Sequence, residues 1–417
     1  MVELPRKGDL ASLRSFDLLA YVDSVPLSLD GVSSILHAMP NLERLQIVLE
    51  PSRQTSGSLS LEPLALKHLR SLRLSWLMDM TSLDWMHLLL AAPNIRELRL
   101  ARCSSPAGGF QTLNVADLPF LEKAEFRYIP MTVLGLKAFF AAAPRLRKMT
   151  FKNDSETYTP FERCEFQEEL YSSMREIAIY FDGSQKGAID SFLPFIERMP
   201  NLQSIYLTQC SVSKKEVDEG VFAGLYLLKS FKLVQSAVTG SYLGSLFNAA
   251  TSLKSLFWND SVCDSPLEYL NEQALCQLST LDFRNVKLEP SILDAFLQRT
   301  PHLQHLILLK VILLITEKNP SLMLAPGSLP ELVEFTREWD TFTALSADDC
   351  LSIIKAAPHL QKLVLPYYFL KHFSDLPDGF LSELKVFYGN KNTCSKPGQE
   401  KKYRKLLRIA PNVATKG

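Results

Sequence analysis

Glycine is scarce in this sequence, with 17 residues among 417, and neither sign of charge is in excess, since 45 basic residues balance 45 acidic ones. Loops that cradle phosphate groups rely on glycine, so its shortage weakens the case for a nucleotide-binding site. A chain without net charge is poorly suited to gripping nucleic acid or an acidic membrane as its main task. We therefore expect no membrane binding and consider nucleic-acid binding a poor fit.

Long hydrophobic runs are also missing. The longest, Leu306 to Ile315, is interrupted by Lys310 and is too short to span a bilayer. The first residues, Met1 to Asp9, lack the apolar segment of a secretory signal. These observations predict a cytoplasmic protein, with the nucleus as the alternative compartment.

The seven cysteines form no Cys-x-x-Cys pair, and no histidine stands beside them at metal-ligand spacing. An odd number of dispersed cysteines argues against a disulfide framework and against a zinc site. We expect reduced thiols and no metal.

Catalytic motifs are absent: the sequence has no Gly-x-Ser-x-Gly, no glycine-rich phosphate loop and no His-Glu-x-x-His. Asp348 and Asp349 precede an expected helix, where N-capping explains them better than acid–base chemistry. His302, His305 and His359 fall in or near expected strands and suit structural or surface roles. We predict that the protein is not an enzyme and has no cofactor. The polar insert from Asn153 to Gln167 is where a catalytic site would first be sought.

One phrase recurs along the whole chain: small residues that end a helix, then Pro, a polar residue and Leu-x-x-Leu-x-Leu. Examples are AAPNIRELRL from Ala91 and AAPHLQKLVL from Ala356. The Pro, or Thr251 in its place, stands at positions 40, 93, 144, 200, 251, 301, 358 and 411, so the spacing stays between 50 and 57 residues. Such regular self-similarity is typical of a repeat protein.

A weaker phrase without Pro lies midway in each interval, as in LKHLRSLRL from Leu66. Both phrases together predict fifteen strands, whose first apolar residues stand at 13, 42, 69, 95, 121, 146, 174, 202, 228, 253, 278, 303, 332, 360 and 384. Alternating apolar residues place one side of each strand in a core. Stretches between strands have helical spacing, as at Leu88, Leu89 and Leu90, and Pro ends each helix. Stacked units then cover each other's bare faces.

The period and the Leu-x-x-Leu-x-Leu core resemble leucine-rich repeats of the ribonuclease-inhibitor-like type. Cys103 and Cys210 stand where that family places Asn or Cys, whereas Leu77, Ile129, Val286 and Val311 depart from it. The resemblance implies a right-handed α/β solenoid, shaped as a horseshoe or arc, with a parallel sheet on the concave face and helices on the convex face. Alternating strong and weak units are also similar to the repeat region of fungal F-box proteins, although no F-box is found here.

We predict one leucine-rich-repeat array over residues 1–417, with about fifteen units. Residues 10–390 hold the clear repeats, and 391–417 form a basic C-terminal helix and a truncated last unit.

The remaining candidate site is the concave sheet face, to which the residues between the leucines point. Exposed aromatic side chains beside arginines are typical of protein interfaces, whereas the alternative is an ordinary solvated face. The candidate partner-binding residues are Arg73, Arg99, Arg127, Lys148, Lys152, Tyr180, Tyr206 and Phe257.

These patterns favour a non-enzymatic scaffold that holds a protein partner on its concave face. The F-box resemblance implies substrate recognition for a ubiquitin ligase, with ligase subunits as further partners. The alternative is an inhibitor or effector-like regulator that occludes a partner protein.

Overall fold

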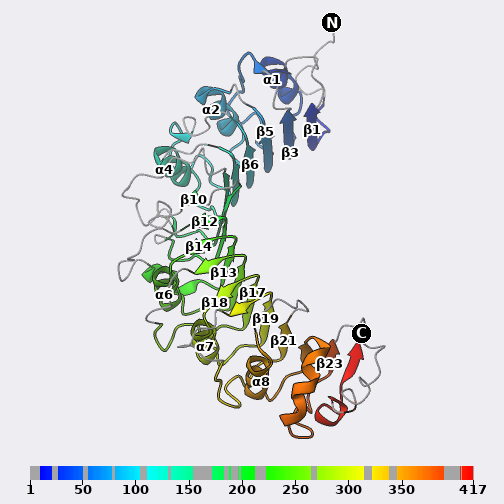
Figure 1. The fold of residues 1–417 in the computed structure, drawn as a ribbon. Helices are drawn as coiled ribbons and strands as arrows, with labels where there is room; N and C mark the ends of the chain where they lie inside the picture. Colours follow the sequence, from blue (N-terminus) through cyan, green and yellow to red (C-terminus); the bar gives the residue numbers. More distant parts are fainter. Residues whose placement is uncertain are drawn as a thin grey trace. The chain divides into compact units, whose positions relative to one another are not determined.

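The computed structural model describes residues 10–20, 27–49, 55–77, 80–103, 110–129, 133–153, 171–182, 187–188, 196, 199–211, 222–263, 270–313, 322–337, 345–388, 404 and 406–416. The chain divides into two compact units, Met1–Leu202 and Gln203–Gly417, here called unit 1 and unit 2. Each unit is built from a parallel sheet with its helices on one side (Figure 1).

The sheet of unit 1 has seven described strands in chain order, each parallel to the next. They are β1 (Ser15–Ala20), β3 (Arg44–Leu49), β5 (Ser71–Ser75), β6 (Glu97–Ala101), β7 (Lys123–Arg127), β8 (Lys148–Asn153) and β9 (Glu176–Phe181). The helices are α1 (Leu29–His37), α2 (Ser82–Ala91) and α4 (Val133–Ala142), and short strands are β2 (Leu27–Ser28), β4 (Thr55–Ser56) and β10 (Gly187–Ala188).

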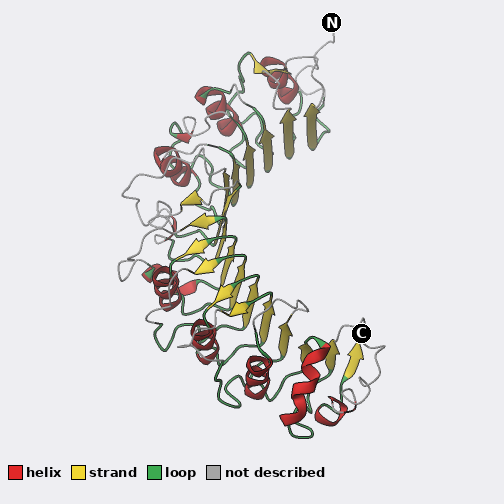
Figure 2. Ribbon diagram, viewed as in Figure 1, coloured by secondary structure: helices red, strands yellow, loops and turns green. Residues whose placement is uncertain are grey.

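Unit 2 repeats this plan with nine described strands in its main sheet. They are β11 (Ser204–Thr208), β13 (Ser230–Val234), β15 (Ser255–Asn259), β17 (Thr280–Arg284), β19 (His305–Leu309), β21 (Glu334–Arg337), β22 (Lys362–Val364), β23 (Val386–Tyr388) and β24 (Ala414–Lys416). A second parallel sheet contains β12 (Cys210–Ser211), β14 (Ala237–Val238), β16 (Val262–Cys263), β18 (Lys287–Leu288) and β20 (Ile312–Leu313). The helices are η2 (Ala223–Leu227), α6 (Gly240–Ala249), α7 (Pro290–Gln298), α8 (Ala347–Ala356) and η3 (Tyr367–Asp375), seen in red in Figure 2.

The fifteen expected strands are present, but each begins two residues later than predicted, so the residue expected to be its first apolar one lies just ahead of the strand. Their leucines point into the core: Leu72, Leu98 and Leu256 are fully buried, and half-exposed residues alternate with them. A further strand, β24, follows the last Pro phrase and pairs with β23. Of the C-terminal segment, Arg404 and residues 406–409 are helical, while residues 389–403 lie outside the described residues.

The Pro phrase follows the end of each helix, as predicted, and its Asn residues form hydrogen bonds with the preceding repeat. Helix α2 ends at Ala91, two residues before Pro93, and α8 ends at Ala356, two residues before Pro358. Where Asn follows the Pro, its amide donates a hydrogen bond to a carbonyl of the preceding repeat, as from Asn94 to Lys67 at 2.6 Å. The same bond is made by Asn41, Asn201 and Asn412.

Two helices begin with a capping box that reaches into the preceding repeat. In α2, the Asp84 carboxylate accepts hydrogen bonds from the Thr81 N–H at 2.8 Å and from the Leu59 N–H at 2.6 Å. In α8, Asp349 does the same with Ser346 and with the Leu322 N–H, both at 2.8 Å. The expected capping role is therefore confirmed for Asp349, whereas Asp348 lies exposed in the first turn.

Candidate functional site

The side of each sheet that faces away from the helices is called here the open face. In unit 1, register brings its residues into rows that cross the strands, so that Gln46, Arg73, Arg99 and Glu125 are successive neighbours. Every second residue of these strands is at least partly exposed, because the intervening leucines occupy the core. Charged side chains are concentrated on this face.

The open face of unit 1 carries more bases than acids. Its described strands hold seven bases, Arg44, Arg73, Arg99, Lys123, Arg127, Lys148 and Lys152, and four acids, Asp17, Glu97, Glu125 and Glu176. Three of the acids form ion pairs. Arg99 lies 2.5 Å from Glu97 and 3.6 Å from Glu125, Arg127 also pairs with Glu125, and Lys148 lies 2.5 Å from Glu176.

The bases around Glu97 shift the pKa of its carboxyl group. Partial burial raises the pKa of Glu97, but the hydrogen bond and charge of Arg99, with Lys123 and Arg73, outweigh it and lower that pKa overall. Glu97 is therefore a carboxylate at neutral pH, and it interacts with several bases at once.

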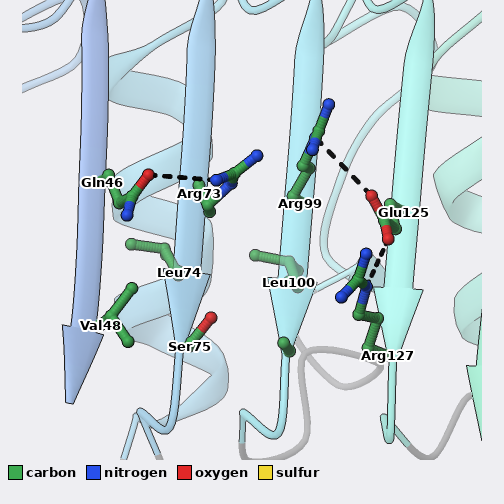
Figure 3. A pocket seen from close by; sticks show the side chains of 10 residues that line it. Gln46, Val48, Arg73, Leu74, Ser75, Arg99, Leu100, Glu125 and Arg127 are labelled. Carbon is green, nitrogen blue, oxygen red and sulfur yellow. Dashed lines mark hydrogen bonds and ion pairs between the residues drawn. The ribbon is translucent and has the colours of Figure 1, made fainter.

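A hollow of about 260 Å³ opens on this face above β3, β5, β6 and β7 (Figure 3). Ser75 and Ala101 are short, so they leave space that three bases, Arg73, Arg99 and Arg127, and one acid, Glu125, border. Arg73 donates a hydrogen bond to Gln46 Oε1 at 3.3 Å and forms no ion pair with another described residue. The hollow thus contains one arginine that forms no ion pair in the described part of the chain, although its charge still acts on Glu97.

The structure brings together most of the predicted site residues. Arg73, Arg99 and Arg127 border the hollow, and Lys148, Lys152 and Tyr180 lie on the following strands of the same open face. Tyr206 and Phe257 belong to unit 2, where both are half-buried on the open face and Phe257 lies 5.2 Å from the Arg284 guanidinium.

A second group of half-buried residues was not found from the sequence. Trp76, Arg102 and Tyr128 directly follow β5, β6 and β7, and all three have positive φ, at 64°, 49° and 53°. The Arg102 guanidinium lies between the two rings, 4.5 Å from Trp76 and 4.3 Å from Tyr128. We call these three residues the edge stack. The available signal was their constant spacing of 26 residues just before the Asn/Cys position.

Beyond the edge stack, Tyr128 and Lys152 share one acid. The Tyr128 hydroxyl donates a hydrogen bond to Asp182 Oδ2 at 2.5 Å, and Lys152 Nζ lies 2.9 Å from the same oxygen. The hydrogen bonds from Tyr128 and Lys152 lower the pKa of Asp182, and the bond to Asp182 raises the pKa of Lys152. Tyr128 is thereby held by Asp182 at its hydroxyl and by Arg102 at the face of its ring.

The two cysteines at the family's Asn/Cys position, Cys103 and Cys210, are buried. The Cys103 thiol donates to the Ala101 carbonyl at 3.4 Å, and burial raises its pKa to about 11. Burial also raises the pKa of Cys210. In unit 2, Ser236 and Ser261 continue this position: the Ser236 hydroxyl accepts the Cys210 N–H at 3.0 Å, and that of Ser261 accepts the Ser236 N–H at 2.9 Å.

The other candidates have local partners. His302 and His359 each lie 2.7 Å from a glutamate of the next repeat, Glu331 and Glu383. Within the described ranges, no group of three or more His, Cys, Asp or Glu side chains is placed to hold a metal ion. Residues 154–167 of the polar insert lie outside the described residues. No helix in the described part of the chain is both long and apolar enough to cross a membrane.

Comparison with known proteins gives the fold but no close relative. No family model and no curated protein matches the chain. A chain of the Drosophila Toll–Spätzle complex matches 99% of this one with a TM-score of 0.50 and 15% identity. Toll is a leucine-rich-repeat protein.

The fold is a leucine-rich-repeat solenoid. A chain of the mouse RP105/MD-1 complex also matches, with a TM-score of 0.44 and 14% identity over 91% of this chain. The chain spans about 60% of the length of its Toll match and 63% of its RP105 match. The parallel sheets and the Toll match confirm the predicted α/β class. Because the sequence identity is low, the likeness is limited to the fold.

Proposed function

We propose that the protein is a binding scaffold that holds a protein partner on the open face of unit 1. The observation that carries the proposal is the hollow bordered by Arg73, Arg99 and Arg127 on a face with seven bases and four acids. Three of those acids are already paired, so an incoming acidic side chain meets uncompensated positive charge. A partner segment rich in Asp or Glu fits this surface.

The Toll match supports the same kind of task, because that protein is described in a complex with another protein, Spätzle. Within this proposal the protein binds rather than catalyses. The finer sequence expectations, substrate recognition for a ubiquitin ligase or occlusion of a regulated protein, would each use such a surface. Co-purification with ubiquitin-ligase subunits separates them, since an inhibitor binds its partner one-to-one without those subunits.

Selection from a random peptide display library tests the proposal directly. We expect the wild-type protein to enrich peptides with several Asp or Glu residues. Arg73→Glu should lower the affinity of the protein for the selected peptides at least about tenfold, because it places a negative charge in the hollow. Gln46 can donate its amide to the new carboxylate, so the thermal midpoint should stay nearly unchanged.

The matched control is Lys355→Glu, which makes the same charge change on the exposed side of α8 in unit 2. It should leave the affinity of the peptides unaltered. Enrichment of peptides without acidic residues, or equal binding by wild type and Arg73→Glu, would refute the proposal.

A further inference from the structure

We infer that the edge stack is a carboxylate clamp in which Arg102 grips an acidic side chain of the partner. This inference rests on the proposed function and names its anchor. Trp76, Arg102 and Tyr128 stand one residue beyond Ser75, Ala101 and Arg127, which border the hollow, so the stack continues that surface to the strand ends. A peptide that crosses the hollow reaches the stack next.

The first argument is the geometry of the guanidinium. Its central carbon lies over the rings of both Trp76 and Tyr128, 4.5 and 4.3 Å from their centroids, and its N–H groups lie in the plane of the planar fork. No hydrogen bond or ion pair joins these N–H groups to another residue of the described ranges. A planar fork held between two rings is suited to a bidentate bond with a carboxylate, for which little side-chain entropy remains to be lost.

The second argument is the backbone. Positive φ is uncommon for residues other than Gly, Asn and Asp, and it is an outlier for a side chain as bulky as Trp76. The position itself recurs in unit 2, where Gln209, Gln235, Asp260, Asn285 and Lys310 occupy it. The positive φ is therefore a property of the repeat in both units, and what is particular to unit 1 is that Trp76 and Tyr128 occupy a position where polar side chains stand in unit 2.

The third argument is the support around the stack. Asp182 accepts a hydrogen bond from Tyr128 and pairs with Lys152, whose ammonium also lies 5.6 Å from the Tyr128 ring. Asp182, on which the charge of Arg102 also acts, is bonded to both Lys152 and Tyr128, so it competes less for Arg102. Trp, Tyr and Arg are also the residues that most often dominate the binding energy of protein interfaces. Together these features describe a preformed anchor for one acidic side chain with an apolar neighbour that packs on the rings.

Binding of a defined probe tests the clamp. The probe is a tetraglutamate peptide, acetylated and amidated at its ends, compared with the equally blocked tetraglutamine peptide by calorimetry and by the fluorescence of Trp76. Of the other three tryptophans, Trp85 and Trp258 are fully buried and Trp339 lies outside the described residues, and the wild-type minus Trp76→Phe difference isolates the signal of Trp76. We expect the tetraglutamate peptide to change this signal and the tetraglutamine peptide to leave it unchanged.

Three variants separate the clamp from the hollow. Arg102→Gln should weaken binding of the tetraglutamate peptide by about tenfold or more, since it removes charge-assisted hydrogen bonds. Arg102→Lys should lose most of the same affinity, because an ammonium keeps the charge but lacks the planar fork. Arg73→Gln should weaken binding while leaving the fluorescence response of Trp76 intact. Lys355→Gln is the control for a lost positive charge far from these residues in sequence, and thermal midpoints verify folding.

The outcomes are distinct. If Arg102→Gln or Arg102→Lys keeps the wild-type affinity for the tetraglutamate peptide while Arg73→Gln loses affinity, the clamp is overturned. The proposed function then still stands. Loss in Arg102→Gln with no effect of Arg73→Gln supports the clamp and removes the hollow from the binding site. Equal binding of the tetraglutamate and tetraglutamine peptides, or no binding of either, overturns both proposals.

Discussion

The two units share a core and differ at their surfaces. In unit 1 the open face is dominated by arginine, lysine and glutamate, and its strand edge carries the edge stack. In unit 2 the first open-face row begins with hydroxyl residues at Ser204, Ser230, Ser255 and Thr280 and continues with His305, Glu334 and Lys362, while the apolar residues Ile307 and Leu309 lie further along β19. The buried leucines are equivalent in both.

This difference shows which residues the fold constrains. Stacking needs the leucines, the cap residues and the hydrogen bonds between repeats, and these recur in both units. The open-face residues are at least partly exposed and join neighbouring repeats only through surface ion pairs and hydrogen bonds, so they are freer to differ. A feature found in one unit alone, such as the edge stack, therefore points to a task rather than to folding.

The largest expected effect concerns the shared core. Leu98→Asp in unit 1 should destabilise the fold by more than about 4 kcal/mol, because it buries a carboxylate without a partner. Leu256→Asp should have an effect of similar size in unit 2, where Leu256 is buried to the same extent. Urea denaturation gives the magnitude, and hydrogen exchange should show lost protection in β5, β6 and β7 for Leu98→Asp.

Arg99→Asp is the control for Leu98→Asp, since Arg99 is the next residue of the same strand and points to the open face. We expect at most about 1–2 kcal/mol there, from its lost ion pairs with Glu97 and Glu125 and from repulsion between these glutamates and the new carboxylate. A comparable loss in both variants would contradict the assigned faces of β6.

The capping boxes give a smaller effect that should again be equal in the two units. Asp84→Ala leaves the N–H groups of Leu59 and Thr81 without their acceptor and should cost about 2–4 kcal/mol. Asp349→Ala should cost a similar amount, for the same reason at Leu322 and Ser346. Chemical denaturation measures both.

Asp348→Ala is the matched control, because Asp348 is adjacent to Asp349 but exposed. Its removal should cost at most about 0.5 kcal/mol, from the helix dipole. If Asp84→Ala and Asp349→Ala differ by more than about 2 kcal/mol, the two caps are not the same structural device.

Much of this structure could be predicted from the sequence, for a physical reason. Strands, helix ends and the buried positions of Cys103 and Cys210 follow from periodicity and from Pro, which act locally. The same period identified Arg73, Arg99 and Arg127 as open-face residues. The hollow was not predictable, because it depends on how short Ser75 and Ala101 are beside those arginines.

The edge stack was missed for a different reason. The sign of φ is not evident from residues such as Trp76, Arg102 and Tyr128, which rarely adopt positive values. Their contacts also join three repeats, so no single repeat shows them. Aligning the repeats by their spacing of 26 residues would have placed the three side chains side by side.

The smallest expected effect has opposite signs in the two units. Gln235 has a φ of 50° and an exposed side chain, and its N–H donates to the Asn259 carbonyl at 2.8 Å, a bond that glycine keeps. Gln235→Gly should therefore stabilise the protein by about 0.5–1 kcal/mol, since relief of the left-handed backbone exceeds the added entropy of the unfolded chain. Arg102→Gly gains the same relief but loses two cation–π contacts, so we expect a net loss of about 0.5–1 kcal/mol. Urea denaturation of both variants decides the point. Stabilisation by both substitutions would mean that the rings contribute nothing to holding Arg102, and the preformed clamp would then lose its structural basis.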